Sequence, residues 1–439
     1  MATWTTTGLR RRSMWFGCVL VITAGCTSAP SPVPATSPTT TPIPSAAAST
    51  IPTSNPTAGQ TPVGVVGEFE WQQVGSFDST PMQIGMAASP AGYVVLTFDG
   101  VWFSADGRAW LKSKLPFPNG TSNGAPLTAQ ANAIAGGPGG FVVVGGQSVK
   151  PCDHVDEGAG GPPQCLVAPI SWASSDGITW KSSLPNPIPA TGARLPEYTE
   201  LVSIWPADGG WDAAAEARAS VSYSGNSLLH SDDGLVWTSR KSAPLPDGAS
   251  SGRDVNAHGG VSSANGTRLL WQYTEIGATY APRSELATTV DGTSWSKVPG
   301  FVGTGAIVRF GLAPEATNAA QWLLIGNGSN QVVTWWQSDD LATWRSGPMT
   351  AAGSPIQAIF SLGRWAGGYI ALGSQDDESY PGVPGTFLSD DGPQWRSAGF
   401  VGPEPTNGPI LMADGPAGLI GVGSDDSGSS TWVGVDPRR

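Results

Sequence analysis

A short pattern that recurs along the chain, S/T-x-D-G-x-x-W, constrains its fold more than any other feature. Asp-Gly between two apolar runs is a strong hairpin signal, because glycine supplies the positive φ of a tight turn and Ser and Asp side chains bond the turn N–H groups. Each copy therefore predicts a strand, a tight turn and a second strand. The turn aspartates are Asp106, Asp176, Asp233, Asp291 and Asp391, and Asp340 in a sixth copy where Leu341 replaces the glycine.

The tryptophans of these copies mark out repeating units. Beginning with Trp71, which has no turn of its own, they follow at intervals of 39 to 70 residues at Trp110, Trp180, Trp237, Trp295, Trp344 and Trp395. Such a period is typical of arrays of one supersecondary unit. Each unit contains four short apolar runs, the last carrying the tryptophan, which favours the blade of a β-propeller. With 59 Gly and 39 Pro, the chain is too rich in turn residues for a helical protein.

The two ends of the repeat region complement each other. The last unit shows only three strand-like runs, and Trp432 in its third run precedes Asp436 as Trp102 precedes Asp106. The apolar segment Glu68–Val74 has no unit before it. We expect this segment to pair with the run around Trp432, because the pairing removes an exposed sheet edge. The sequence thus predicts an all-β, seven-bladed β-propeller of four-stranded blades over residues 67–439.

The N-terminal region has the features of an exported, anchored protein. In residues 1–25, three arginines (10–12) precede the apolar run Met14–Ile22, which is typical of a signal peptide. The sequence ending in Cys26 resembles a bacterial lipoprotein cleavage box, although Thr23 stands where leucine is usual, and the arginines also resemble a twin-arginine signal. An ordinary secretory signal is the alternative. Residues 26–66, rich in Pro, Ser and Thr, predict a disordered tether.

Charge and cysteine content restrict the function further. A net charge of −12 disfavours nucleic acid and anionic lipid head groups as partners. Cys152 and Cys165 flank one Gly/Pro-rich insertion, and in an exported chain they predict a local disulfide. Three scattered histidines give no support for a metal site or a Ser-His-Asp triad. We expect neither a metal nor a cofactor.

The repeats resemble the Asp-box, or BNR, repeats of sialidases, sortilin-type receptors, photosystem assembly factors and secreted bacterial propellers. The usual box has one more residue between aspartate and glycine than this chain does. The resemblance implies a propeller in which the boxes lie away from the ligand face, so that the box aspartates cap turns. We expect the tryptophans to pack between blades.

The ligand face should lie opposite the Asp-Gly turns, at the loops between second and third strands and between blades. Arg, Tyr and acidic residues map there, although long loops are polar in any protein. The candidates are Arg194, Tyr198, Glu200, Arg218, Tyr223, Glu275, Tyr280, Arg283, Asp376 and Tyr380. The sequence favours a monomeric, non-catalytic binding scaffold, lipid-anchored at the outer face of a bacterial membrane, which recognises an extracellular glycan, peptide or protein.

Two alternatives remain open. A sialidase-like exoglycosidase would need an arginine cluster, a tyrosine nucleophile activated by a glutamate, and an acid/base aspartate. Candidates for these roles include Arg309 and the triplets Tyr198-Thr199-Glu200 and Tyr273-Thr274-Glu275, but the Arg-Ile-Pro motif of those enzymes is missing. The second alternative is a factor that assembles a membrane complex.

Overall fold

The computed structural model describes a chain built from β-strands. It describes residues 69–78, 83–117, 121–122, 125–126, 129–148, 167–183, 199–207, 209–219, 222–240, 254–262, 268–275, 283–290, 294–301, 307–312, 322–328, 332–365, 368–375, 384–401, 408–425 and 428–435. Within these ranges there is no helix, and therefore no helical segment suited to crossing a membrane. The all-β class predicted from the turn pattern is correct.

Five sheets have four strands each, every strand antiparallel to the next. They are β2–β5 (Gln83–Ser89, Gly92–Thr97, Gly100–Ser104, Leu111–Ser113) and β8–β11 (Ala129–Gly137, Gly140–Ser148, Val167–Ser174, Lys181–Ser182). The third and fourth are β12–β15 (Thr199–Ala207, Gly210–Ala219, Ser222–Ser231, Thr238–Arg240) and β16–β19 (Asp254–Ser262, Arg268–Glu275, Arg283–Thr289, Ser296–Lys297). The fifth is β20–β23 (Ile307–Leu312, Trp322–Asn327, Val333–Ser338, Arg345–Pro348).

The last sheet is larger and includes the N-terminal strand. Its order is β26-β27-β28-β29-β1-β32-β31-β30. The strands are β26–β29 (Ala358–Trp365, Gly368–Ser374, Gly385–Ser389, Arg396–Phe400), β30–β32 (Leu411–Gly415, Gly418–Asp425, Gly428–Val435) and β1 (Glu70–Phe77). Two small hairpins, β6–β7 (Thr121–Ser122, Ala125–Pro126) and β24–β25 (Thr350–Ala351, Ser354–Pro355), lie in the connections.

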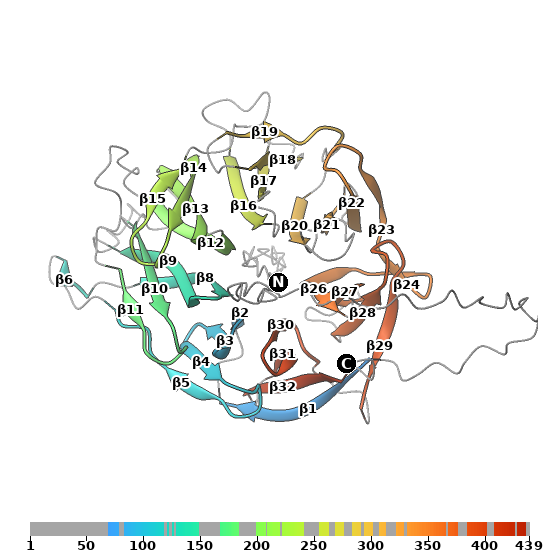
Figure 1. Ribbon diagram of the computed structural model, residues 1–439, viewed down its shortest axis with the longest axis horizontal. Helices are drawn as coiled ribbons and strands as arrows, with labels where there is room; N and C mark the ends of the chain where they lie inside the picture. Colours follow the sequence, from blue (N-terminus) through green and yellow to red (C-terminus); the bar gives the residue numbers. More distant parts are fainter. Residues whose placement is uncertain are drawn as a thin grey trace, which may run out of the picture.

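The N-terminal strand lies where the sequence places it. β1 runs antiparallel to β32, with Gln73 facing Trp432 and Trp71 facing Gly434. It also runs parallel to β29 over a short stretch in which Glu70 faces Gly399. The first and last described strands of the chain therefore share one sheet (Figure 1).

The sheets radiate from a common centre, as in a β-propeller (Figure 1). The strands nearest that centre are termed inner strands: the first strand of each four-stranded sheet, and the two end strands of the eight-stranded sheet, β26 and β30 (Figure 1). The inner strands touch in succession: β2 contacts β8, β8 contacts β12, and so on through β16, β20, β26 and β30, which contacts β2. The third and fourth units, whose strand patterns are weak in the sequence, form regular sheets, and β13 and β14 are ten residues long each.

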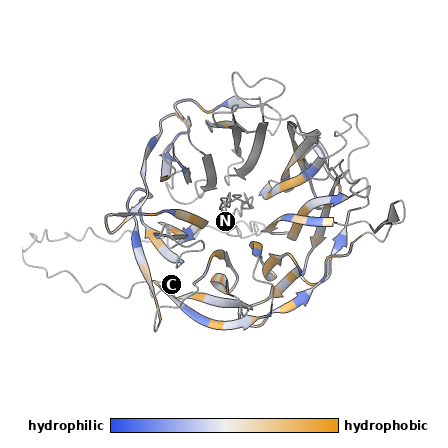
Figure 2. Cartoon of the chain, turned by 180° about the vertical axis from the view of Figure 1, so that it is seen from behind, coloured by the Kyte–Doolittle hydropathy of each residue, from blue (hydrophilic) through white to orange (hydrophobic). Residues whose placement is uncertain are grey.

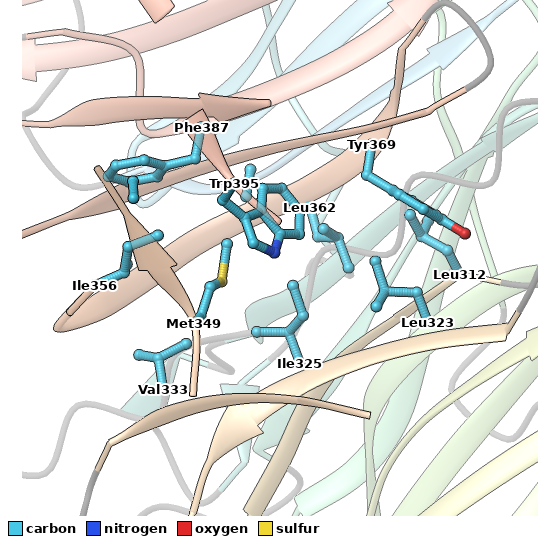
Figure 3. Close-up of a cluster of buried hydrophobic side chains, with 12 residues drawn as sticks. Leu312, Leu323, Ile325, Val333, Met349, Ile356, Leu362, Tyr369, Phe387 and Trp395 are labelled. Atoms are coloured by element: carbon cyan, nitrogen blue, oxygen red, sulfur yellow. The ribbon is translucent and has the colours of Figure 1, made fainter. Parts of the chain in front are cut away.

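The core lies between adjacent sheets. Second strands such as β3 and β27 are buried along their whole length, whereas outer strands such as β5 are largely exposed. In Figure 2 the peripheral strands accordingly carry more hydrophilic residues. Figure 3 shows one such interface, where Met349 and Ile325 of one sheet meet Trp395 and Leu362 of the next. Hydrophobic burial between sheets is therefore the main force that holds them side by side.

Tryptophans also join neighbouring sheets through hydrogen bonds. Two indole N–H groups donate to hydroxyls of the adjacent sheet: Trp110 to Thr431 of β32 (2.8 Å) and Trp237 to Ser171 of β10 (2.9 Å). Trp71 of β1 donates to Thr386 of β28 (2.7 Å), two strands away in the eight-stranded sheet. The box tryptophans precede the fourth strands by one residue, whereas the repeat pattern predicted them within those strands. These tryptophan side chains pack between neighbouring sheets, as predicted.

Candidate functional site

At one end of the sheets, the turns of the S/T-x-D-G-x-x-W copies, termed Asp-box turns after the repeat they resemble, satisfy their own polar groups. In four boxes the glycine N–H donates to the serine Oγ at 2.8 Å, as Gly177 does to Ser174. The aspartate Oδ1 accepts the next N–H groups, which for Asp176 are those of Ile178 (2.9 Å) and Thr179 (2.7 Å). The N–H of Thr179 lowers the pKa of Asp176 to about 2. These hydrogen bonds cap the turn and occupy Oδ1 of the carboxylate.

The box glycines are required by both conformation and space. Gly107, Gly177, Gly234 and Gly392 have φ between 73° and 87°. A Cβ at Gly177 would overlap the ring of Phe103 in the preceding sheet, and one at Gly234 would overlap Val142. Leu341 adopts the same left-handed region with φ 60°, and its side chain packs with Leu286 and Val298. In each described copy the aspartate Oδ1 accepts a hydrogen bond from a turn N–H, in agreement with the predicted turn-capping role. These aspartates are Asp106, Asp176, Asp233, Asp340 and Asp391. Asp291 lies outside the described residues.

The other end of the sheets holds the described part of the predicted ligand face. Arg218 on β13 faces Tyr223 on β14, next to the hairpin that is farthest from the Asp-box of that sheet. In the neighbouring sheet Glu275 faces Asp254, and Arg283 faces Thr274, again at the end opposite the box. The backbone therefore brings these candidates to the same end of two adjacent sheets.

The remaining candidates fall outside what the structure describes. Arg194, Tyr198, Tyr280, Asp376 and Tyr380 lie outside the described residues, as do Cys26, Cys152 and Cys165. The predicted disulfide and lipid attachment site therefore stay predictions. Within the described ranges, no group of three or more His, Cys, Asp or Glu side chains is arranged to hold a metal ion.

Glu200 is the one predicted ligand-face residue whose side-chain contacts are described. It begins inner strand β12, is 9% exposed, and its Oε2 accepts a hydrogen bond from Asn132 Nδ2 of the preceding sheet at 3.2 Å. The same Asn132 amide donates to the carbonyl oxygen of Leu201 at 2.9 Å. A carboxyl group and a carboxamide thus meet between β8 and β12, two strands that lie near the centre of the molecule (Figure 1).

Asn132 occupies a β-bulge that recurs in the inner strands. In six of them the register against the second strand shifts by one residue, so that two residues face one. The inserted residues are Ile84, Asn132, Val202, His258, Arg309 and Phe360. Just before β30, the N–H of Ile410 donates to the carbonyl of Val422, which faces Leu411, so a similar two-against-one arrangement is present there.

Buried polar atoms without a partner flank three of these bulges. Gln83 Oε1, just before Ile84, has no hydrogen-bond partner among the described residues, although Gln83 Nε2 donates to Ser429. The hydroxyls of Ser203 and Ser361, 2% and 0% exposed, immediately follow bulge residues and are likewise without a partner in the described part. A buried unpaired polar group costs free energy. The box end has one as well among the described residues, Nε1 of Trp395, so such atoms occur at both ends of the sheets.

A histidine at the box end makes a third polar cluster. His230 Nδ1 lies 2.7 Å from Oδ1 of the buried Asp212, and Nε2 lies 3.0 Å from Oδ1 of the exposed Asp232. The hydrogen bond to Asp212 raises the pKa of His230 above its ordinary value. The cluster joins two adjacent strands of one sheet, β13 and β14, so it stabilises that sheet locally.

Sequence reasoning missed the bulges and Asn132. The residues inserted at the bulges share no chemical type, so no motif marks them. A bulge is defined by the register against the paired strand, which the sequence of one strand does not show.

Comparisons with known proteins leave the chain without a family. No family model and no curated protein matches it. Solved structures align weakly: a GH43 β-1,3-galactosidase in complex with galactodeoxynojirimycin shares 13% identity, with 53% of this chain and 89% of that chain covered and a TM-score of 0.34. Aleuria aurantia lectin with α-methyl-L-fucoside shares 12% over 78% and 97% of the chains, with a TM-score of 0.38.

A third solved structure is the GH93 α-L-arabinofuranosidase of Fusarium graminearum with arabinobiose, at 13% identity over 66% and 89% of the chains and a TM-score of 0.38. At TM-scores this low, none of the three similarities bears on what this protein binds.

Proposed function

We propose that the protein is a non-catalytic binding scaffold that recognises an extracellular glycan, peptide or protein partner at the bulged end of its sheets. The observation that carries this proposal is the contrast between the two ends. The Asp-box carboxylates are bonded to their own turns, whereas Asn132, Glu200, Arg218 and Tyr223 gather at the opposite end. Of the described side chains at that end, Asn132 and Glu200 meet between two inner strands.

The scaffold in this proposal is a closed, seven-bladed propeller. The succession of contacts among inner strands from β2 to β30 and back to β2 supports the blade number. The pairing of β1 with β32 supports closure by the N-terminal strand. A closed ring of blades leaves only short sheet edges and makes a rigid support for binding loops. Asp-box repeats of the shortened form found in this chain would be the turns of this propeller.

The location in this proposal rests on the sequence. A basic, then apolar segment ending at Cys26 supports export and lipid attachment, and residues 26–66 supply a tether between membrane and propeller. Radiolabelled palmitate incorporation, compared between the natural chain and Cys26→Ser, tests it. Equal labelling of both chains, or labelling of neither, would remove the anchor.

A glycan array and a pull-down from envelope extracts test the binding role, with the mature chain as bait. The test variant is Asn132→Ala, and the matched control is Asp106→Asn at the box end. We expect a defined ligand or partner to be retained by the natural chain and by the control, and lost by the test variant. Equal retention by both variants would contradict the bulged end as the binding face.

The alternative is a sialidase-like exoglycosidase, which the register of one sheet favours. Arg218 faces Tyr223 and Glu200 faces Glu216 at the same end, so an arginine, a tyrosine and glutamates share one sheet end. Release of the fluorophore from a fluorogenic sialoside by the natural chain, abolished in Tyr223→Phe, would establish the enzyme. No release above the variant's background would leave the binding role alone.

A further inference from the structure

One pair of facing residues, Asp212 and His230, differs in kind from its equivalents beside the other boxes. His230 directly precedes the box serine of its sheet, and Asp212 faces it from the second strand. At the five other boxes the two equivalent positions hold no charged or ionisable side chain: Val94 and Phe103, Val142 and Ala173, Leu269 and Thr288, Leu323 and Gln337, and Ile370 and Leu388. Sheet β12–β15 thus has an ionisable pair where the others have a neutral one.

This pair lies where the next sheet packs. Two of its equivalents, Phe103 and Val142, are the side chains that lie against the box glycine of the following sheet. Asp212 shares one face of β13 with Ala214, which packs with Ala287 of β18, because side chains alternate along a regular strand. The pair is therefore part of the contact between β12–β15 and β16–β19.

The other two buried carboxylates of the described chain also border sheet β12–β15. Glu285 is 9% exposed, and its Oε2 lies 3.3 Å from Nζ of Lys297. It shares a face of β18 with Ala287, and that face is turned toward β12–β15. Glu200, on the other side of the sheet, is bonded to Asn132 of β8. Among the described residues, buried carboxylates thus occur only at the two contacts that hold this sheet between its neighbours (Figure 1).

Contacts of this kind stabilise less than the apolar contacts between other sheets. Removing a charged group from water costs free energy that its partner returns only in part, so a buried ion pair is often no more stabilising than apolar side chains of the same volume. An apolar cluster such as the one in Figure 3 carries no such cost. Because a protein opens locally where its contacts are weakest, the two sides of β12–β15 are where opening should begin.

We propose that sheet β12–β15 opens before the other sheets, separating from both neighbours as a unit, and that loss of a proton from His230 promotes this opening. Arg218 and Tyr223 lie at the bulged end of the same sheet, so its opening moves two residues of the predicted ligand face. The inference concerns a conformational device within the fold, and binding at the bulged end does not depend on it.

The direction of the pH effect follows from the groups around His230. These are Asp212 at 2.7 Å from Nδ1, Asp232 at 3.0 Å from Nε2, the uncharged Thr238 facing it on β15, and Glu285 with Lys297 on the neighbouring sheet. The hydrogen bond to Asp212 raises the pKa of His230 above 6.5. The contact is therefore complete below about pH 6.5, and it weakens as the pH rises through the raised pKa and the imidazolium loses its charge.

Hydrogen exchange of the mature chain tests the proposal. It is followed by mass spectrometry at about pH 6 and about pH 9, and each rate is corrected for the chemical exchange rate at that pH. Amides of β13 and β14 should be less protected than those of β3 and β27, two strands that are buried along their whole length. The higher pH should lower protection in β13 and β14 about fivefold more than in β3 and β27.

Variants assign the effect to the ionisable pair. His230→Gln should remove the additional pH dependence of β13 and β14. Asp212→Val combined with His230→Phe introduces the residue types of the equivalent pair in β2–β5, and should raise the protection of β13 and β14 at about pH 9 by about fivefold or more. The matched control Lys112→Gln breaks the Asp99–Lys112 ion pair at the surface of β2–β5 and should leave exchange in β12–β15 unchanged.

Three results would each overturn the inference. They are equal protection of β13 and β14 and of β3 and β27 at both pH values, an additional pH dependence that persists in His230→Gln, and unchanged protection in the folded double variant. Should the double variant fail to fold, judged by thermal melting, His230→Gln decides alone. A ligand captured by the natural chain leaves the binding function standing in every case.

Discussion

At the Asp-box end, Ser174 and Asp176 bond the backbone of their own turn, and the glycine between them and the tryptophan lies against the preceding sheet. At the bulged end, Asn132 of one sheet bonds Glu200 of the next, and aliphatic, aromatic, amide and basic residues occupy one equivalent position of the inner strands. The same four-stranded unit thus repeats its sequence at one end and varies it at the other. The proposed binding function assigns stability to the uniform end and recognition to the varied end.

A tryptophan replacement at the box end should cause the largest loss of stability. Trp237 is 1% exposed, and its Nε1 donates to Ser171 of the preceding sheet. We expect Trp237→Ala to lower the free energy of unfolding by about 3–5 kcal/mol, through lost packing and a cavity. Denaturant unfolding followed by circular dichroism measures the loss.

A conservative variant and a variant at the other end sharpen this test. Trp237→Phe keeps most of the packing and loses the hydrogen bond, so we expect about 1 kcal/mol of destabilisation. Asn132→Ala should cost less stability than Trp237→Ala but should weaken ligand binding, which Trp237→Phe leaves intact. If Trp237→Phe weakened binding as much as Asn132→Ala, the separation of the two ends would fail.

Replacing a turn glycine should lower the free energy of unfolding by less than Trp237→Ala does. In Gly177→Ala a side chain must adopt φ near +73° and displace the ring of Phe103. Left-handed backbone costs a non-glycine residue about 1–2 kcal/mol, so we expect a loss of about 2 kcal/mol or somewhat more, measured by thermal and denaturant unfolding. Binding at the opposite end should not change.

Leu341 provides the converse variant of the same prediction. Leu341→Gly removes the backbone strain of φ 60°. It also removes a leucine side chain that is only 9% exposed and packs with Leu286. Loss of a buried leucine costs about 2–5 kcal/mol, which exceeds the strain relieved, so this change should also destabilise. A stabilised Leu341→Gly would show that the box needs glycine for its backbone alone.

The sequence predicts the box end well because each requirement there is local. Ser174, Asp176 and Gly177 lie within four positions of each other, and their identities follow from the turn that they cap. The N-terminal strand was predictable for a related reason, since Trp71 continues the series of tryptophans and its partner lies near Trp432.

The bulged end was only partly predictable. Glu200, Arg218 and Tyr223 were assigned to it from the order of strands and loops, and the backbone register places them there. The bulges were missed because they arise from the bending of inner strands around a common centre, which is a property of the assembled sheets. Asn132 lies inside an apolar run, and only its contact with the next sheet shows its role.

The smallest effect concerns His230, a titratable group at the box end. Its hydrogen bond to the buried Asp212 raises its pKa above 6.5, so the folded state holds the proton more tightly than the unfolded state. The resulting stabilisation is fully present below about pH 6.5 and is lost as the pH rises through the raised pKa. We expect the natural chain to lose about 1 kcal/mol more than His230→Gln between about pH 6 and about pH 9. Asp232→Asn should change this pH dependence little, since Asp232 is 88% exposed.

Ligand affinity, measured over the same pH range, should be equal for the natural chain and His230→Gln, because His230 lies at the box end of the sheets. A difference in affinity between them would show that a proton taken up at the box end reaches the recognition end, and the two ends would have to be treated as coupled.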